Sequence, residues 1–141
     1  MPRSAEDPVR LEKRIRMIIV LIHWRIKPDK TADLVDFWKT QATVNDRLGL
    51  IQEVLSEAQS PRDFKYITWH LDPKSLGNFV SYVNVGVWLD DAAFEEQIGK
   101  YFNDTGQLRD FEQFRRRRTV LKPIAWRIGN AQLPPEPAGV L

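Results

Sequence analysis

The alternation of apolar and polar residues along the chain predicts four β-strands and two helices. A period of two residues, typical of strands, runs through 17–27, 50–58, 79–89 and 117–128. Apolar residues recur at helical spacing over 32–45 and again after Asp91. The element order, βαββαβ, is that of the ferredoxin-like fold, so we expect an α+β domain with a four-stranded antiparallel sheet.

The composition of each strand predicts its place in the sheet. The first and third strands are the most apolar and are expected at the centre. The second strand carries Glu53 and Glu57, and the fourth contains Pro123, which lacks a backbone donor, so both are expected at the edges. One side of the third strand is expected to face the core, and it consists of Phe79, Ser81, Val83, Val85, Val87 and Leu89. The other side is aromatic and polar, as a cavity wall is: Val80, Tyr82, Asn84, Gly86 and Trp88.

Short polar residues mark the expected helix starts. Thr31 is predicted to cap the first helix, and Asp90 with Asp91 to cap the second. A further short helix is predicted from three apolar residues at helical spacing, Leu108, Phe111 and Phe114.

The chain divides into one domain with flanking segments. Residues 1–16 lack periodicity and predict a flexible N-terminal arm. Residues 17–130 form the ferredoxin-like domain, with 59–78 as an insert between its second and third strands. The β-prone run 64–71 predicts an extra strand or arm within the insert. The proline-rich end, 131–141, is a tail.

Two helices cover only one face of such a sheet. The other face is expected to carry Met17, Ile19 and Leu21 with Val80, Tyr82 and Trp88. At about 25 cal/mol per Å² of apolar surface, leaving these side chains in water forfeits several kcal/mol. We therefore expect a homodimer in which a second sheet covers this face, related by a two-fold axis. The alternative is that the arm and the insert cover the face within one chain.

Composition narrows the possible partners. The chain has no cysteine, which excludes a disulfide framework and thiolate chemistry and fits a cytoplasmic protein. The longest apolar run, 17–22, is too short to cross a bilayer, so we expect no membrane partner. The net charge is only +2, and the basic run 115–118 stands alone, so we expect no nucleic-acid partner.

The stretch 82–97 resembles the third strand and second helix of the antibiotic biosynthesis monooxygenase-like family, within the dimeric α/β barrel superfamily. The shared pattern is a strand ending in Trp88, an acidic helix start at Asp90, and Ala93-Phe94-Glu95. The order of elements over 17–128 is similar to that family throughout.

This resemblance implies a function as well as a fold. The family includes cofactor-free monooxygenases that oxidise aromatic polyketides or quinols, haem-degrading proteins, and proteins with no known reaction. In the monooxygenases an Asn and a Trp on the third strand hold the substrate oxygens, and Asn84 and Trp88 match this pair. Phe94 stands where those enzymes carry a tyrosine. The haem-degrading members need a His after the second helix, and 100–103 contains none, so we expect no cofactor.

Four further side chains are candidates for the site. His23 is a possible base if it shares the cavity with Asn84; the alternative is a histidine bonded for structure. Tyr82 is the best-placed hydroxyl donor, and Arg25 could counter an anion or else pair at the surface. Trp24 and Phe94 complete the expected substrate contacts. Two widely separated histidines predict no metal site.

We therefore expect a cofactor-independent oxygenase, or a closely related enzyme, that deprotonates a small aromatic or quinone-type molecule, with Asn84, Trp88 and His23 as its catalytic residues. The pocket is expected either between the sheet and the helices or between the sheet and the partner sheet. Asn84 would stabilise the negative oxygen of the substrate anion. The alternative is a non-catalytic dimeric module that binds a small ligand or only assembles, in which Asn84 bonds to backbone and Trp88 fills the dimer core.

Overall fold

A computed structural model of the chain describes residues 16–40, 47–59, 64, 71, 77–101 and 106–137. The N-terminal arm except Arg16, most of the 59–78 insert and its predicted extra strand lie outside the described residues. The elements are β1 (Ile18–Ile26), the 3-10 turn η1 (Pro28–Lys30), α2 (Thr31–Thr40), β2 (Leu50–Glu57), β3 (Val80–Trp88), α3 (Asp91–Gln97), the 3-10 turn η3 (Gly99–Tyr101) and β4 (Glu112–Leu121).

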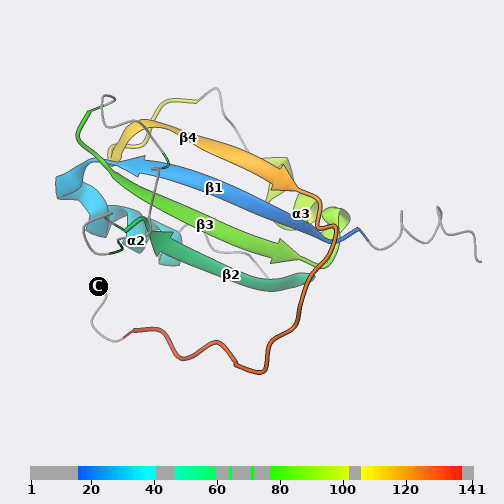
Figure 1. Ribbon diagram of the computed structural model, residues 1–141. Coiled ribbons are helices and arrows are strands. Elements are labelled where there is room, and N and C mark those ends of the chain that lie inside the picture. Colours follow the sequence, from blue (N-terminus) through cyan, green and yellow to red (C-terminus); the bar gives the residue numbers. More distant parts are fainter. Residues whose placement is uncertain are drawn as a thin grey trace, which may run out of the picture.

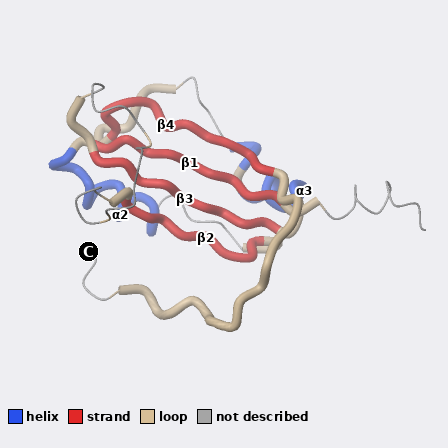
Figure 2. The backbone as a smooth tube through the Cα atoms, viewed as in Figure 1, coloured by secondary structure: helices blue, strands red, loops and turns tan. Residues whose placement is uncertain are grey.

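The four strands form one antiparallel sheet in the order β2-β3-β1-β4. The two apolar strands are central and the two strands with polar or proline signals are at the edges, which confirms the predicted α+β class and strand order. Both helices lie behind one face of the sheet (Figures 1 and 2). The structure is compatible with a ferredoxin-like fold.

The core lies between this face and the two helices. At one end Trp88 is 1% exposed and its ring packs edge-on against Phe94 of α3, with centroids 5.6 Å apart. At the other end Leu34 of α2 is fully buried beside Trp24. Burying a side chain such as Leu34 contributes about 1.5–3 kcal/mol. These contacts fix α2 and α3 over opposite ends of the sheet.

The two faces of β3 are the reverse of the prediction. The register pairs Trp24 with Tyr82 and Ile22 with Asn84, so the aromatic and polar side faces the helices. Its members Tyr82, Asn84, Gly86 and Trp88 are all buried. The valine side, with Val83 and Val85, faces away from them. The prediction was wrong because it assigned the core to the more aliphatic side, whereas here aromatic rings fill it.

Local signals placed α3 correctly and α2 in part. Asp90 caps α3 as predicted, since its side chain accepts a hydrogen bond from the Ala93 backbone N–H at 2.7 Å. Thr31 was predicted to cap α2, but it is the first residue of that helix and directly follows η1. The predicted end of that helix, 41–45, lies outside the described residues.

The last strand begins earlier than predicted and the expected short helix at 108–114 is absent from the described chain. β4 runs from Glu112 to Leu121, not from Arg117 to Ile128. The pairing of β4 with β1 is irregular beside Arg25, and β4 extends beyond this irregularity to Glu112, ahead of the predicted start. Pro123 follows the strand and lacks the backbone donor that would extend it.

Beyond β4 the chain is extended and has no regular secondary structure as far as Pro137. It turns around the end of the sheet and runs past the outer side of β2 toward α2 (Figure 1). Three large side chains in its first half are exposed: Ile124 by 83%, Trp126 by 68% and Ile128 by 83%. The second half closes the site described next.

Candidate functional site

A cavity of about 590 Å³ lies between α2, the edge strand β2 and the C-terminal segment. Its walls combine apolar and polar side chains from three elements. They include Ala32, Val35 and Trp38 of α2, Glu53, Leu55 and Glu57 of β2, and Tyr82 of β3. A cavity of this size and mixed lining is typical of small-ligand sites.

A chain of three side chains forms the polar side of the cavity. The Trp38 indole N–H donates to Asn84 Oδ1 at 3.1 Å, and Asn84 Nδ2 donates to Glu53 Oε2 at 3.1 Å. Asn84 is 4% exposed and does not line the cavity itself, whereas Trp38 and Glu53 do. Asn84 therefore holds the two cavity-facing groups in fixed positions.

Glu53 is the carboxylate most affected by this environment. Burial raises the pKa of Glu53, while the hydrogen bond from Asn84 and the charge of Arg47 oppose the rise. Glu53 lies opposite Gly86 in the sheet, and a Cβ at Gly86 would come within 3.5 Å of Glu53 Oε2 and 3.2 Å of the Trp88 indole nitrogen. The tighter of these two contacts is the one to Trp88, so the glycine leaves room chiefly for the indole, and a Cβ would be in ordinary contact with the carboxylate.

A second polar pair lies farther along the same wall. The Tyr82 hydroxyl donates to Glu57 Oε1 at 3.0 Å. Burial, followed by the hydrogen bond to Glu57, raises the pKa of Tyr82. Tyr82 therefore stays a neutral hydroxyl beyond the usual range of tyrosine, and it can donate or accept a hydrogen bond but is a poor base.

The C-terminal segment forms the outer side of the cavity through Leu133, Pro134, Pro135, Glu136 and Pro137. Lys39 at the end of α2 approaches Glu136 at 3.3 Å, and both side chains are partly exposed. Such exposed pairs contribute about 0–1 kcal/mol. This side is therefore held less firmly than the sheet side.

The structure brings only some of the predicted site residues to this cavity. Tyr82 lines it and Asn84 lies directly behind it. Trp88 and Phe94 pack on each other in the core, and neither lines the cavity. Trp24 is buried between Phe37 and Phe111.

His23 and Arg25 lie on the opposite face of the sheet from Asn84. The register pairs His23 with Val83, while Asn84 pairs with Ile22. Arg117 Nη2 is 2.9 Å from His23 Nδ1. Arg25 donates to the Arg115 carbonyl and stacks 5.1 Å from the Phe114 ring centroid. The expectation that His23 shares a cavity with Asn84 is wrong. Successive side chains of a strand point to opposite faces, and His23 is next to Ile22, which pairs with Asn84 on the cavity side.

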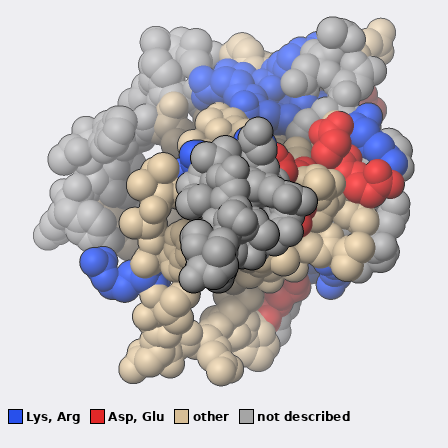
Figure 3. Space-filling model, turned by 90° about the vertical axis from the view of Figure 1, so that its right-hand side faces the viewer, with Lys and Arg blue, Asp and Glu red and all other residues tan. Residues whose placement is uncertain are grey.

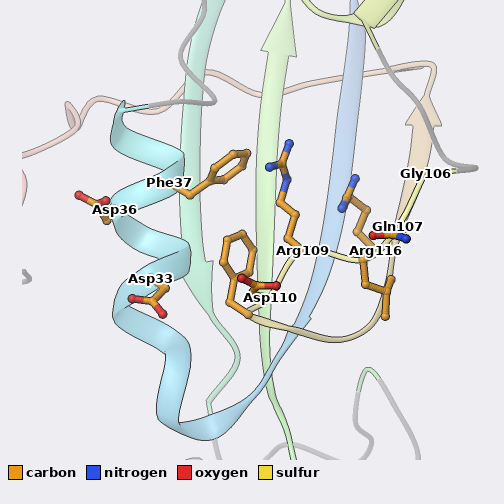
Figure 4. A pocket seen from close by; sticks show the side chains of 10 residues that line it. Asp33, Asp36, Phe37, Gly106, Gln107, Arg109, Asp110 and Arg116 are labelled. Carbon is orange, nitrogen blue, oxygen red and sulfur yellow. The ribbon is translucent and has the colours of Figure 1, made fainter.

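A second cavity, of about 650 Å³, lies on another side of α2, along Asp33, Asp36 and Phe37 (Figure 4). Asp33 and Asp36 of α2 lie across from Arg109 and Arg116. The Arg109 guanidinium stacks 4.1 Å from the Phe37 ring centroid. Four of its ten lining residues are exposed charged side chains, namely Asp33, Asp36, Arg109 and Asp110. The half-buried Glu53 carboxylate and the buried Asn84 amide behind it belong to the first cavity.

The basic run of β4 is largely a structural feature. Figure 3 shows Lys and Arg side chains gathered at the level of this strand. Glu112, 2% exposed, pairs with the Arg116 guanidinium and also accepts the Arg109 and Arg116 backbone N–H groups at 3.0 and 3.1 Å. Arg116 also lies 5.0 Å from the Trp24 ring centroid. Glu112 thus neutralises one arginine of the run inside the protein.

Among the described residues, no group of three or more His, Asp or Glu side chains could hold a metal ion. In the same part of the chain, no helix is long and apolar enough to cross a membrane.

Glu53 and Trp38 line the cavity but were not predicted as site residues. A signal for Glu53 was present, because Glu53, Leu55 and Glu57 alternate on one side of a predicted strand. The carboxylates were attributed to an exposed edge, but α2 and the C-terminal segment cover that edge. Trp38 belongs to the apolar stripe of its helix, and nothing in the stripe indicates a hydrogen bond to β3.

Neither a model of a known protein family nor any curated protein matches this chain. The chemistry of the site must therefore be argued from its own residues. The cavity offers a desolvated carboxylate held by an amide, a neutral hydroxyl and an indole wall. This set can bind a planar molecule, accept a hydrogen bond or a proton from it, and shield it from water.

Proposed function

We propose that this protein is a homodimeric, cofactor-independent oxygenase acting on a small aromatic or quinone-type molecule in the cavity between α2 and β2. The observation that carries the proposal is the buried amide of Asn84, which joins the Trp38 indole to the Glu53 carboxylate at the cavity wall. Asparagine is disfavoured in strands, and a buried amide on a central strand needs a purpose or a full set of partners.

The proposed reaction uses dioxygen as the oxidant. Removal of a proton from an electron-rich aromatic substrate leaves an anion whose electrons reduce oxygen directly. For a reactive methylene next to an aromatic ring, the overall change is CH₂ + O₂ → C=O + H₂O. One oxygen atom enters the product and the other leaves as water, so no external reductant is consumed.

The shape and lining of the cavity support an aromatic ligand. Ala32, Val35 and Leu55 give it apolar walls, and Trp38 offers an indole surface for stacking. The outer side is formed by Pro134 and Pro135, which are apolar and rigid. Closure by these groups would keep water from a reactive anion.

The role of Asn84 differs in detail from the one that the family resemblance implies. Both ends of its amide are bonded to protein groups, at 3.1 Å each. Asn84 would therefore act by orienting Glu53 and Trp38. The indole of Trp88 is 1% exposed, so we assign the stacking wall to Trp38 instead.

A homodimer is the proposed assembly because much of the sheet face away from the helices is aliphatic, although His23, Arg25 and Arg117 lie on the same face. We define this open face by the partly exposed side chains Ile19 and Leu21 of β1, Val54 of β2, and Val83, Val85 and Val87 of β3. The segment after β4 adds Ile124, Trp126 and Ile128, which are each more than two-thirds exposed. A second copy packed on this face with two-fold symmetry would bury both sets at once.

A ligand-binding module without catalysis is the second candidate. It is favoured by one observation, namely that Asn84 does not line the cavity and that its amide bonds to Trp38 and Glu53. In that case the polar chain would serve only to recognise the ligand.

Oxygen uptake with a panel of hydroquinones and phenols separates the two candidates. The oxygenase predicts consumption of oxygen by the purified protein without added cofactor, and a large loss of it in Asn84→Ala. Thr40→Ala is a suitable control, because it removes an exposed hydrogen bond to the Asp36 carbonyl away from the cavity. Absence of uptake with every compound would favour the binding module.

A further inference from the structure

The cavity holds one side chain placed to receive a proton. Glu53 lines the cavity and uses Oε2 to accept from Asn84 at 3.1 Å. Its second oxygen, Oε1, has no hydrogen-bond partner within the described part of the chain. A carboxylate with one oxygen anchored and the other free is oriented and still able to accept.

Other candidates for this task are excluded by their positions or partners. His23 faces the far side of the sheet. Tyr82 is a neutral donor bonded to Glu57. Glu57 is exposed, whereas Glu53 is half-buried, and Glu136 pairs with Lys39 at 3.3 Å. Among the carboxylates of the described residues that line the cavity, Glu53 is the one that bonds to the buried Asn84 amide.

The charged groups around Glu53 leave it an effective acceptor. Arg47 before β2 and Lys39 at the end of α2 are the cations near this wall, while Glu57, Tyr82 and Glu136 are the other titratable groups. Arg47 acts on Glu53 only through its charge. Desolvation is the largest influence on the carboxylate, and it makes Glu53 more basic than an exposed glutamate.

We infer that Glu53 is the proton acceptor of this site, that Asn84 is its positioning residue, and that the ligand is a planar aromatic compound with an acidic hydroxyl. This inference rests on the proposed function and names its substrate class. In the transfer the ligand O–H bond breaks, the proton bonds to Glu53 Oε1, and the electron pair stays on the ligand oxygen. The Trp38 indole lies at the same wall, where it can stack on the ring.

The class of ligand follows from the groups that would meet it. A hydroxyl can donate to the Glu53 carboxylate, whereas an anionic ligand would be repelled by Glu53 and Glu57 together. An aromatic ring fits the apolar and indole walls. The neutral phenol, enol or hydroquinone is therefore the form that enters.

The pH dependence of ligand binding tests this assignment without requiring turnover. The probe is para-nitrophenol, and para-nitroanisole is the matched compound that has no hydroxyl proton. In the native protein, affinity for the phenol should rise with pH as Glu53 ionises and fall again as the phenol itself ionises. The rise should be about tenfold or more, the range of a hydrogen bond to a charged acceptor.

Two variants make the test specific. Glu53→Gln should abolish the rise and weaken the fall, because the amide cannot change its charge. Glu95→Gln, an equal charge change on the exposed side of α3, should keep the native profile. The anisole should show no rise in any protein.

The outcomes separate this inference from the proposed function. A native profile retained in Glu53→Gln would overturn the assignment of Glu53, even if oxygen were consumed. The predicted profile together with its loss in Glu53→Gln would support Glu53 as acceptor, even if no oxygen were consumed and the oxygenase proposal failed. Where oxygen is consumed, kcat should fall about 10²- to 10⁴-fold in Glu53→Gln, and KM should rise by about the same tenfold that the variant loses in affinity for the phenol.

Discussion

Glu53 Oε2 lies 3.1 Å from Asn84 Nδ2, so a carboxylate of an edge strand is anchored to a buried amide of a central strand. The same amide accepts from the Trp38 indole of α2. One residue of β3 therefore fixes groups from α2 and β2, two of the three segments that enclose the cavity. The predictions below follow from this arrangement and from the packing around it.

Asn84→Ala should lower the free energy of unfolding by about 1–3 kcal/mol, because it leaves the Trp38 N–H and the Glu53 carboxylate without their shared partner. Denaturation by urea, followed by tryptophan fluorescence, measures this change. Thr40→Ala, which removes an exposed hydrogen bond on α2, should change the same quantity by less. Equal effects of the two substitutions would contradict a structural role for the amide.

The stability of the native protein relative to Glu53→Gln should fall as pH rises. The pKa of Glu53 is raised in the folded state, so folding is favoured by protonation of this group. This contribution to stability is complete below the pKa of Glu53 in the unfolded chain. It is lost as pH rises through the pKa of Glu53 in the folded protein. The free energies of unfolding of the native protein and of Glu53→Gln are measured at acidic and at neutral pH. Their difference should shift in favour of the glutamine variant on going to neutral pH, and a shift the other way would refute the raised pKa of Glu53.

Glu112→Ala should destabilise the protein by about 3–5 kcal/mol, because it leaves the guanidinium of Arg116 buried without its counter-charge. Thermal and chemical denaturation measure the loss. The double change Glu112→Leu with Arg116→Met removes both charges and should cost less than Glu112→Ala alone. If the double variant loses at least as much stability as Glu112→Ala, the Glu112–Arg116 pair is not what stabilises this end of β4.

Val85→Lys should dissociate the proposed dimer. Val85 pairs with Leu21 on one side and Val54 on the other, which places it at the middle of the open face. Sedimentation velocity at micromolar protein should show a dimer for the native chain and a monomer for the variant. Val120→Lys is the matched control, because Val120 pairs with Val20 and belongs to the other side of the sheet. A monomeric native protein would remove the basis for the dimer.

The fold was more predictable than the site. The periods of Ile18–Ile26 and Val80–Trp88 identify strands whatever they pack against, and Asp90 marks the start of a helix by local chemistry. The direction in which β3 faces depends on tertiary packing, since both of its sides are apolar enough for a core. The cavity needs contacts between β2, α2 and a segment about eighty residues further along the chain, and no local pattern reports such contacts.

The residues of the site illustrate the same limit. Asn84 was identifiable because a polar amide in an apolar strand is unusual. Glu53 was not, because a glutamate in an edge strand is ordinary until another element covers it. His23 was a candidate because of its chemical type alone. The alternation of side chains along β1 places it on the sheet face opposite to Asn84.

The most direct test of the whole account is the indole N–H signal of Trp38 during titration with para-nitrophenol. The five tryptophans give five indole signals in a ¹H–¹⁵N spectrum, and Trp38→Phe identifies the one that matters. If the cavity between α2 and β2 is the ligand site, the Trp38 signal should move in a saturable way while that of the exposed Trp126 stays nearly fixed. A Trp38 signal that does not move at ligand concentrations that saturate binding would contradict the account.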